Sequence, residues 1–262
     1  MCGIIAAAST RNVGKLLVQG LHKMEYRGYD SAGIALHQEN SITHLRALGK
    51  VQLLEDMMIS EKPKSKLGIA HTRWATHGEP SKANAHPHKS KDKVYIVHNG
   101  IIENYIGLKE ALVKEGYEFS SETDSELIAH LLDSYLEKGN SMIDAMYLAK
   151  EKLEGAYAIA AIDMNNNNSL VVARNKSPLL LGIGTDEMLA ASDPLAIGQL
   201  TNEFIFLEDG DVAEISAESY KIFDENKKEV EREITNIDIS SQATSKGEYK
   251  HFMEKEIYEQ PE

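Results

Sequence analysis

The order of expected strands and helices is the feature that most limits how this chain can fold. Segments with strand character follow one another in blocks joined by turns, and the helices also cluster. Strands are expected at 2–8, 32–37, 42–47, 67–71, 93–98, 155–162, 170–173, 179–183, 188–191, 204–207, 211–215 and 220–223. Helices are expected at 13–24, 51–59, 104–115, 127–136 and 141–153. Parallel sheets need regular strand–helix–strand alternation, which is missing here, so the sequence predicts an α+β fold of antiparallel sheets with helices layered outside them.

Cys2 is the only cysteine in 262 residues, and it stands at the start of the first expected strand. If Met1 is removed, Cys2 carries a thiol and a free α-amine, which together form a nucleophile–base pair on one residue. An α-amine has a pKa of about 7.7–8.0 and acts as a base near neutrality, while a thiol, at about 8.5, gains from such a base. The alternative is a small buried apolar residue in a strand, the usual role of a lone cysteine.

Composition excludes several classes of partner. The chain has 41 acidic and 28 basic residues, and a net charge of −13 argues against nucleic acid and against anionic membrane surfaces. A single cysteine rules out an intramolecular disulfide and fits a reducing, cytoplasmic location. No targeting segment is visible, and no run approaches the roughly 18 apolar residues that a membrane span needs.

A long polar stretch, from His71 to about Lys93, interrupts the strand pattern. Loops of this length are uncommon inside a compact domain and tend to be functional. This one contains the only tryptophan, Trp74, next to Arg73, whose guanidinium fork suits bidentate capture of a carboxylate. Taken alone, Arg73 is equally consistent with a surface cation.

Two further sites combine polar groups at the ends of expected elements. Asn99-Gly100 ends the strand at 93–98, where the pair is typical of a hairpin turn but also supplies the amide NH₂ and backbone N–H of an oxyanion hole. Asp124 lies in Thr123-Asp124-Ser125-Glu126, interpreted as a capping box, where it favours the helix dipole or pairs with a substrate ammonium. A nucleophile, a carboxylate binder, an oxyanion donor and an ammonium partner together indicate hydrolysis of an amide on an amino acid.

Histidines concentrate in the same region and raise the alternative of a metallohydrolase. Five of the ten are His71, His77, His86, His88 and His98. A metallohydrolase site also needs carboxylate ligands at a suitable spacing from the histidines. The two acids in this stretch are Glu79 and Asp92, and neither fits a known ligand spacing. We therefore predict no metal, and we assign these histidines to packing and hydrogen bonding beneath the polar stretch.

Motifs spread over the chain resemble the class II glutamine amidotransferases and, within them, the glutaminase domains of the glucosamine-6-phosphate synthase family. They are Cys2-Gly3-Ile4, Tyr26-Arg27-Gly28-Tyr29-Asp30-Ser31-Ala32-Gly33, His71-Thr72-Arg73-Trp74-Ala75-Thr76-His77-Gly78, Asn84-Ala85-His86-Pro87-His88, His98-Asn99-Gly100 and Ser121-Glu122-Thr123-Asp124. The resemblance implies a four-layer αββα sandwich of the N-terminal-nucleophile hydrolase type. It also implies conversion of L-glutamine to glutamate and ammonia through a Cys2 thioester, without a cofactor.

The resemblance also implies roles for individual residues. Cys2 is expected to attack the glutamine amide, with Asn99 and the Gly100 backbone stabilising the oxyanion. The expected substrate-binding residues are Arg73 for the α-carboxylate, Asp124 for the α-ammonium, Trp74 on a mobile glutamine loop, Thr76 and His77 beside Arg73, Arg27 and Gly28 at the floor of the nucleophile site, and His86.

The expected domain organisation is a glutaminase domain at 2–223 and a charged tail with a helix, near 247–258, at 224–262. The tail resembles the segment that leads towards a sugar-isomerase half, so the chain is expected to be the N-terminal part of a longer protein. In that protein, which the resemblance implies to be a homo-oligomer, the ammonia is expected to pass to fructose 6-phosphate.

Two other functions stay open from the residues. The same fold is compatible with hydrolysis of a different amide, such as a conjugated acid, although Arg73 and Asp124 favour a free amino acid. A regulatory domain that binds an amino acid without turnover is the second alternative, and the presence of Cys2, Asn99 and Gly100 together argues against it.

Overall fold

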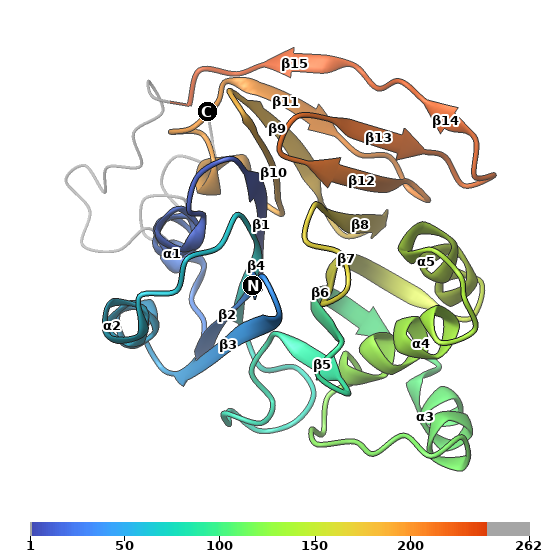
Figure 1. Cartoon of the computed structure of the whole chain (residues 1–262). Coiled ribbons are helices and arrows are strands. Elements are labelled where there is room, and N and C mark those ends of the chain that lie inside the picture. The colour runs from blue at the N-terminus through green and yellow to red at the C-terminus, as the bar shows by residue number, and fades with distance from the viewer. Residues whose placement is uncertain (1, 240–262) are drawn as a thin grey trace, which may run out of the picture.

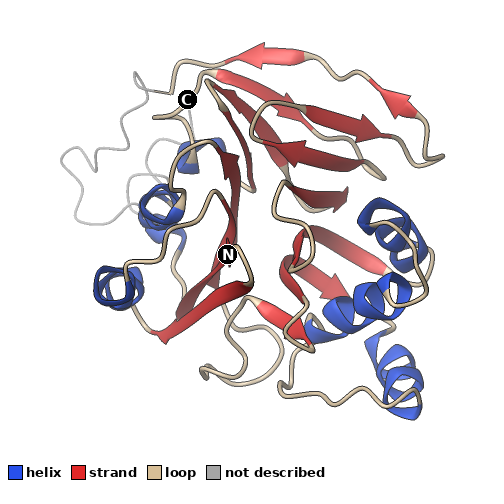
Figure 2. Cartoon of the chain, in the orientation of Figure 1, coloured by secondary structure: helices blue, strands red, loops and turns tan. Residues whose placement is uncertain are grey.

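The computed structural model describes residues 2–239, which form four layers: helices, a sheet, a second sheet, and helices again (Figures 1 and 2). Every strand pair in both sheets is antiparallel. The predicted α+β architecture of two antiparallel sheets between helix layers is therefore confirmed.

The first sheet has eight strands and is covered by two helices. Its strands, in spatial order, are β15 (Ile234–Asn236), β11 (Glu203–Phe206), β9 (Leu180–Gly184), β10 (Glu187–Ala191), β1 (Gly3–Ser9), β4 (Leu67–Arg73), β2 (Ser31–Gln38) and β3 (Ser41–Leu48). The helices are α1 (Gly14–Lys23) and α2 (Val51–Glu61), with short 3₁₀ turns η1 (Glu25–Arg27) and η2 (Pro194–Ala196).

The second sheet has seven strands and is covered by three helices. In spatial order the strands are β14 (Glu229–Val230), β13 (Tyr220–Phe223), β12 (Val212–Ser216), β8 (Ser169–Asn175), β7 (Gly155–Asp163), β6 (Val94–Ile102) and β5 (His88–Ser90). The helices are α3 (Tyr105–Lys114), α4 (Glu126–Leu136) and α5 (Met142–Lys150).

Strand β1 shows why the chain forms this sandwich. Successive side chains of a strand point to opposite faces. Ile5 and Ala7 pack in the apolar layer under α1 and α2, while Ile4, Ala6 and Ala8 pack in the layer between the two sheets. A run that is apolar at every position therefore buries both faces, and full burial of each isoleucine stabilises the fold by about 1.5–3 kcal/mol. Cys2, directly before β1, is fixed at the end of this strand.

Two local predictions are wrong. Asn99-Gly100 is not a turn: β6 continues through it to Ile102, because residues 155–158 of β7 pair with this part of the strand. The capping box at Thr123–Glu126 is also absent. Helix α4 begins at Glu126 itself, no side chain caps it, and the Glu126 carboxylate instead accepts hydrogen bonds from Ser120 and Ser121.

The charged segment after Phe223 contributes to both sheets as far as the structure describes it. Strand β14 pairs with β13, and β15 pairs with β11. The boundary expected at 223 therefore does not coincide with the end of the sheets. The helix expected near 247–258 lies outside the described residues.

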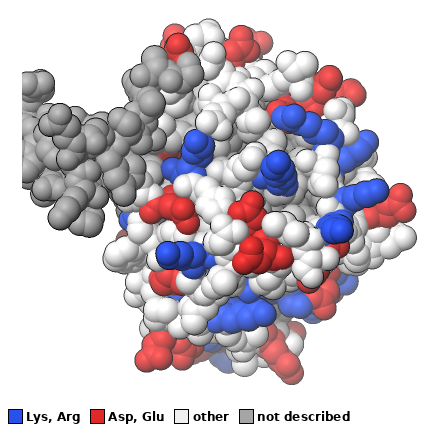
Figure 3. All heavy atoms as spheres, turned by 90° about the vertical axis from the view of Figure 1, so that its left-hand side faces the viewer, with Lys and Arg blue, Asp and Glu red and all other residues white. Residues whose placement is uncertain are grey.

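The surface on the side of α1 and α2 carries acidic and basic side chains next to one another, without a field of one sign (Figure 3). Among the described residues visible in that view, Lys and Arg do not form an extended basic patch of the kind that binds nucleic acid. Between residues 2 and 239, no helix combines the length and apolar character needed to cross a membrane.

Candidate active site

Cys2 lies against the loop that follows β4. The backbone N–H of Trp74 donates to the Cys2 Sγ at 3.3 Å, and the thiol lies 3.6 Å from the Trp74 carbonyl oxygen. This contact continues the pairing of β1 with β4, in which Gly3 stands opposite Thr72. The sheet register therefore sets the position of the sulfur.

Burial raises the pKa of the Cys2 thiol above its ordinary value, and the hydrogen bond from Trp74 and the positive charge of Arg73 only partly oppose this effect. The thiol is thus mostly protonated at neutral pH. A nucleophilic Cys2 consequently needs a base that takes its proton as attack occurs.

Asn99 reaches Cys2 from the facing sheet. Its side-chain NH₂ donates to the Cys2 carbonyl oxygen at 3.2 Å. Strand β5 pairs with β6 only as far as Ile96, so the edge of β6 opposite β7 is open from there onward. The structure therefore places the Asn99 side chain against Cys2, and the catalytic roles of both residues stay predictions.

The same open edge presents the backbone of Gly100. The His98 N–H donates to His86 Nδ1 at 3.2 Å, and the Ile102 N–H donates to Asp124 Oδ2 at 2.8 Å, so both groups point away from β7. Alternate residues of an antiparallel strand direct their N–H and C=O groups to the same side. Gly100, midway between these two, thus directs its N–H and C=O to this edge as well.

Gly100 is a position that only glycine fits. Its φ is +129°, and a Cβ built there would lie 1.9 Å from the Ala156 carbonyl oxygen. Glycine therefore lets the backbones of β6 and β7 lie close together at this point, and it tolerates the positive φ of the strand here.

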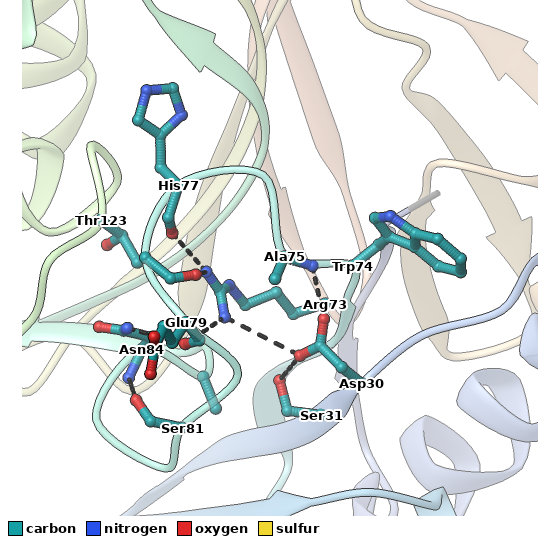
Figure 4. Close-up of polar contacts among 12 residues, drawn as sticks. Asp30, Ser31, Arg73, Trp74, Ala75, His77, Glu79, Ser81, Asn84 and Thr123 are labelled. Carbon is teal, nitrogen blue, oxygen red and sulfur yellow. Dashed lines mark hydrogen bonds and ion pairs between the residues drawn. The ribbon is translucent and has the colours of Figure 1, made fainter.

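Arg73 is 4% exposed and lies inside the loop that it begins (Figure 4). Its Nη2 donates to the carbonyl oxygens of His77 and Gly78, the latter at 3.0 Å, and its Nη1 donates to that of Glu79 at 3.4 Å. Three of the five N–H groups of the guanidinium thus donate to loop carbonyls, and Asp30 Oδ1 lies 3.8 Å from Nη1.

Asp30, which is not among the predicted site residues, stabilises the first residues of this loop. Its carboxylate accepts a hydrogen bond from the Ala75 N–H and lies 3.8 Å from Arg73 Nη1. The signal was present, because Asp30 belongs to the motif that contains Arg27 and Gly28. The acid thus joins two motifs far apart in the sequence.

Arg27 and Gly28 are held beside the same loop. Gly28 has a φ of +74°, and a Cβ there would lie 2.6 Å from the Trp74 ring. Arg27 Nη2 forms an ion pair at 2.5 Å with Asp193, which also accepts a hydrogen bond from Tyr26 at 2.6 Å. Asp193 was not predicted, since nothing in its local sequence marks it.

Asp124 is 4% exposed and lies just before α4, where its Oδ2 receives the Ile102 N–H. Because Ile102 lies two residues after Gly100 in β6, this hydrogen bond places the Asp124 carboxylate beside the open edge of β6. The remaining predicted residues lie less centrally. Thr76 is exposed on the loop, and the ring of His77 packs edge-on against Tyr105, 5.6 Å between centroids, and turns away from Arg73 (Figure 4).

His86 is buried, with its ring stacked on His71 at 4.1 Å between centroids. Its contact with Asn99 runs through His71, so its predicted role in substrate binding stays a prediction. Within residues 2–239 no group of three or more His, Cys, Asp or Glu side chains is arranged to hold a metal ion.

The family model described as a glutamine amidotransferase domain matches residues 71–199. The chain is 50% identical, over all its 262 residues, to the glutamine–fructose-6-phosphate aminotransferase (isomerizing) of Vibrio parahaemolyticus, and 50% identical to the protein of the same name from Salmonella typhi. Each alignment covers 100% of this chain but only 43% of the relative, so the chain spans less than half the length of these proteins.

Solved structures show the same fold. The glutamine phosphoribosylpyrophosphate amidotransferase from B. subtilis superposes with a TM-score of 0.72 and 25% identity, over 84% of this chain and 48% of that one. A structure described as the allosteric regulatory enzyme of purine biosynthesis gives a TM-score of 0.73 and 26% identity, with the same coverage.

Proposed function

The chain belongs to the glutamine amidotransferase family, and we propose that it hydrolyses the side-chain amide of L-glutamine to glutamate and ammonia. The observation that carries this proposal is the contact between Cys2 and the Asn99 side chain of β6, whose NH₂ donates to the Cys2 carbonyl oxygen at 3.2 Å. The N–H of the next residue, Gly100, points to the edge of β6 away from β7, as the N–H groups of His98 and Ile102 do.

The proposed chemistry uses Cys2 as both nucleophile and base. With Met1 removed, the α-amine takes the thiol proton as sulfur attacks the amide carbon. The negative charge that develops on the amide oxygen is stabilised by the Asn99 NH₂ and the Gly100 N–H. The amine then returns the proton to the leaving nitrogen, ammonia departs, and water hydrolyses the thioester to glutamate and free thiol.

Substrate selection in this proposal depends on two buried charges. The two N–H groups of Arg73 that the loop carbonyls do not use would bind the α-carboxylate. Asp124 and the Gly100 C=O would accept the α-ammonium. Both charges are 4% exposed, and a charge in such a setting is stabilised by an opposite charge, which favours a zwitterionic amino acid over a simple amide.

The longer relatives are named glutamine–fructose-6-phosphate aminotransferases. We extend the proposal to the whole protein, in which ammonia released at Cys2 would pass to fructose 6-phosphate bound by a second, sugar-isomerase half. A thiol nucleophile suits the reducing cytoplasm, and a homo-oligomeric state of the whole protein stays a prediction.

The test is a glutaminase assay on the 262-residue chain, with Cys2→Ala as its control. We expect glutamate and ammonia in equal amounts from glutamine, and none from Cys2→Ala. Binding of glutamine by calorimetry without turnover would identify a regulatory domain instead. Faster cleavage of a primary amide that lacks the α-amino and α-carboxyl groups would identify an amidase of other specificity.

A further inference from the structure

Four buried histidines lie directly behind the proposed oxyanion donors, and the mechanism above assigns none of them. They are His71, His86, His88 and His98, each 0–4% exposed. His71 is the one in contact with Asn99. It sits in β4, where Ile4 of β1 and Gly33 of β2 flank it on either side, so its backbone is fixed by two neighbouring strands.

The hydrogen bonds of His71 determine which ring nitrogen carries the proton. Its Nε2 lies 3.1 Å from the His98 carbonyl oxygen. A carbonyl oxygen only accepts, so Nε2 must be the protonated nitrogen. This conclusion is independent of how the Asn99 amide is oriented.

The tautomer of His71 in turn determines the orientation of Asn99. His71 Nε2 also lies 2.9 Å from the Asn99 side chain. An N–H can be met only by an acceptor, so the Asn99 atom facing it is Oδ1, and the NH₂ faces Cys2. The opposite orientation would bring two donors together at His71 and two oxygens together at Cys2.

The ring of His71 is also kept neutral and in place. Burial lowers its pKa to about 3, so at neutral pH it has a single proton. The ring stacks on His86 with an interplanar angle of 23°, and His86 is itself held by the hydrogen bond from the His98 N–H. Rotation of the His71 ring would break the bonds to both His98 and Asn99.

We propose that His71 is a positioning residue for the reaction: its Nε2–H holds Asn99 Oδ1, so that the Asn99 NH₂ is turned towards Cys2 as an oxyanion donor. This inference depends on the proposed glutaminase function. His71 does not touch the reacting atoms, and it acts on the rate through the amide that it orients.

Removal of the His71 Nε2–H group should lower kcat rather than weaken the binding of glutamine. Loss of one oxyanion donor costs roughly 10²–10³ in kcat, and an amide that is present but no longer held retains part of that effect. We expect His71→Leu to lower kcat by roughly 10–10², with KM changed less than about threefold. His71→Gln, whose amide can still donate near the Nε2 position, should recover most of this loss.

Two controls separate positioning from general damage. His130→Leu removes another buried histidine, 4% exposed, which is bonded to Ser90 of β5 and not to Asn99; kcat should stay within about twofold. In an Asn99→Ala background, His71→Leu should cost less than about threefold, because the group that it orients is gone. A merely structural His71 would give equal losses in both backgrounds.

The tautomer is testable without activity. Protein labelled with ¹⁵N-histidine should show a neutral His71 with its proton on Nε2 in two-bond ¹H–¹⁵N correlation spectra. A proton on Nδ1, or a full loss from His71→Leu on top of Asn99→Ala, would overturn the inference. If the wild-type chain binds glutamine but releases no glutamate, the proposed function fails, while the tautomer still decides whether His71 orients Asn99.

Discussion

Replacement of Gly100 by alanine should destabilise the fold and displace the proposed oxyanion donors on β6. The new Cβ would lie 1.9 Å from the Ala156 carbonyl oxygen, about 1.5 Å closer than ordinary contact, and its neighbour is backbone that cannot swing aside. The φ of +129° adds a strain of about 1–3 kcal/mol for any residue with a side chain. We therefore expect a loss of at least 1–3 kcal/mol in the free energy of unfolding.

The activity loss should exceed what stability explains. Strands β6 and β7 must separate or the Gly100 peptide must rotate, and displacement of a catalytic group by about 1 Å can cost roughly 10²-fold in rate. Glutamate release under conditions where circular dichroism shows the variant folded is the measurement. KM should change less than kcat, since the displaced groups act on the oxyanion.

Gly107→Ala is the matched control. Gly107 lies in α3, a Cβ there would meet nothing within 4 Å, and alanine in a helix is more stable than glycine by about 0.5–1 kcal/mol. That variant should keep wild-type activity and gain slightly in stability. If Gly100→Ala unfolds at the same denaturant concentration as wild type and turns over normally, the argument from the close approach at Ala156 is wrong.

Three further predictions concern the nucleophile, the oxyanion donor and the loop. Blocking removal of Met1 should abolish glutamate release, because the polar contacts of the Cys2 Sγ within residues 2–239 are with the Trp74 backbone and include no histidine that could replace the amine as base; full activity with the amine blocked would refute the mechanism. Asn99→Ala should lower kcat by roughly 10²–10³ with little change in KM, and the reverse pattern would place Asn99 in ground-state binding. Glutamine should shift the emission of Trp74, 51% exposed, in a Cys2→Ala protein, and Arg73→Ala should remove the shift. Flat emission while calorimetry records binding would mean that the loop is preformed.

Much of the architecture follows from local patterns. The continuous apolar run of β1 identifies a strand buried on both faces, and the spacing of Leu127, Leu131 and Leu132 identifies α4, which buries the face that its period predicts. Cys2, Arg73 and Asp124 could also be singled out from the sequence, because their residue types already limit the chemistry, and their roles stay predictions. In the structure the Asn99 side chain contacts the Cys2 backbone.

The errors arise where distant segments override local preference. Asn99-Gly100 has the composition of a turn, but pairing with β7, more than fifty residues later, keeps it extended. Glu126 has the position of a capping residue, but here a neighbouring turn decides: the N–H and O–H groups of Ser120 and Ser121 provide the Glu126 carboxylate with four hydrogen-bond donors. The links made by Asp30 and Asp193 depend on the same long-range geometry, which no window of the sequence contains.

Strand β1 also has a consequence for the motions of the site. It is hydrogen-bonded on both edges, to β10 and β4, and apolar layers cover both of its faces. Its amides can therefore exchange with solvent only when the whole domain opens, whereas the loop after Arg73 can fluctuate by breaking a few bonds to carbonyl oxygens. We therefore expect the amides of β1, which begins directly after Cys2, to exchange more slowly than those of the loop after Arg73.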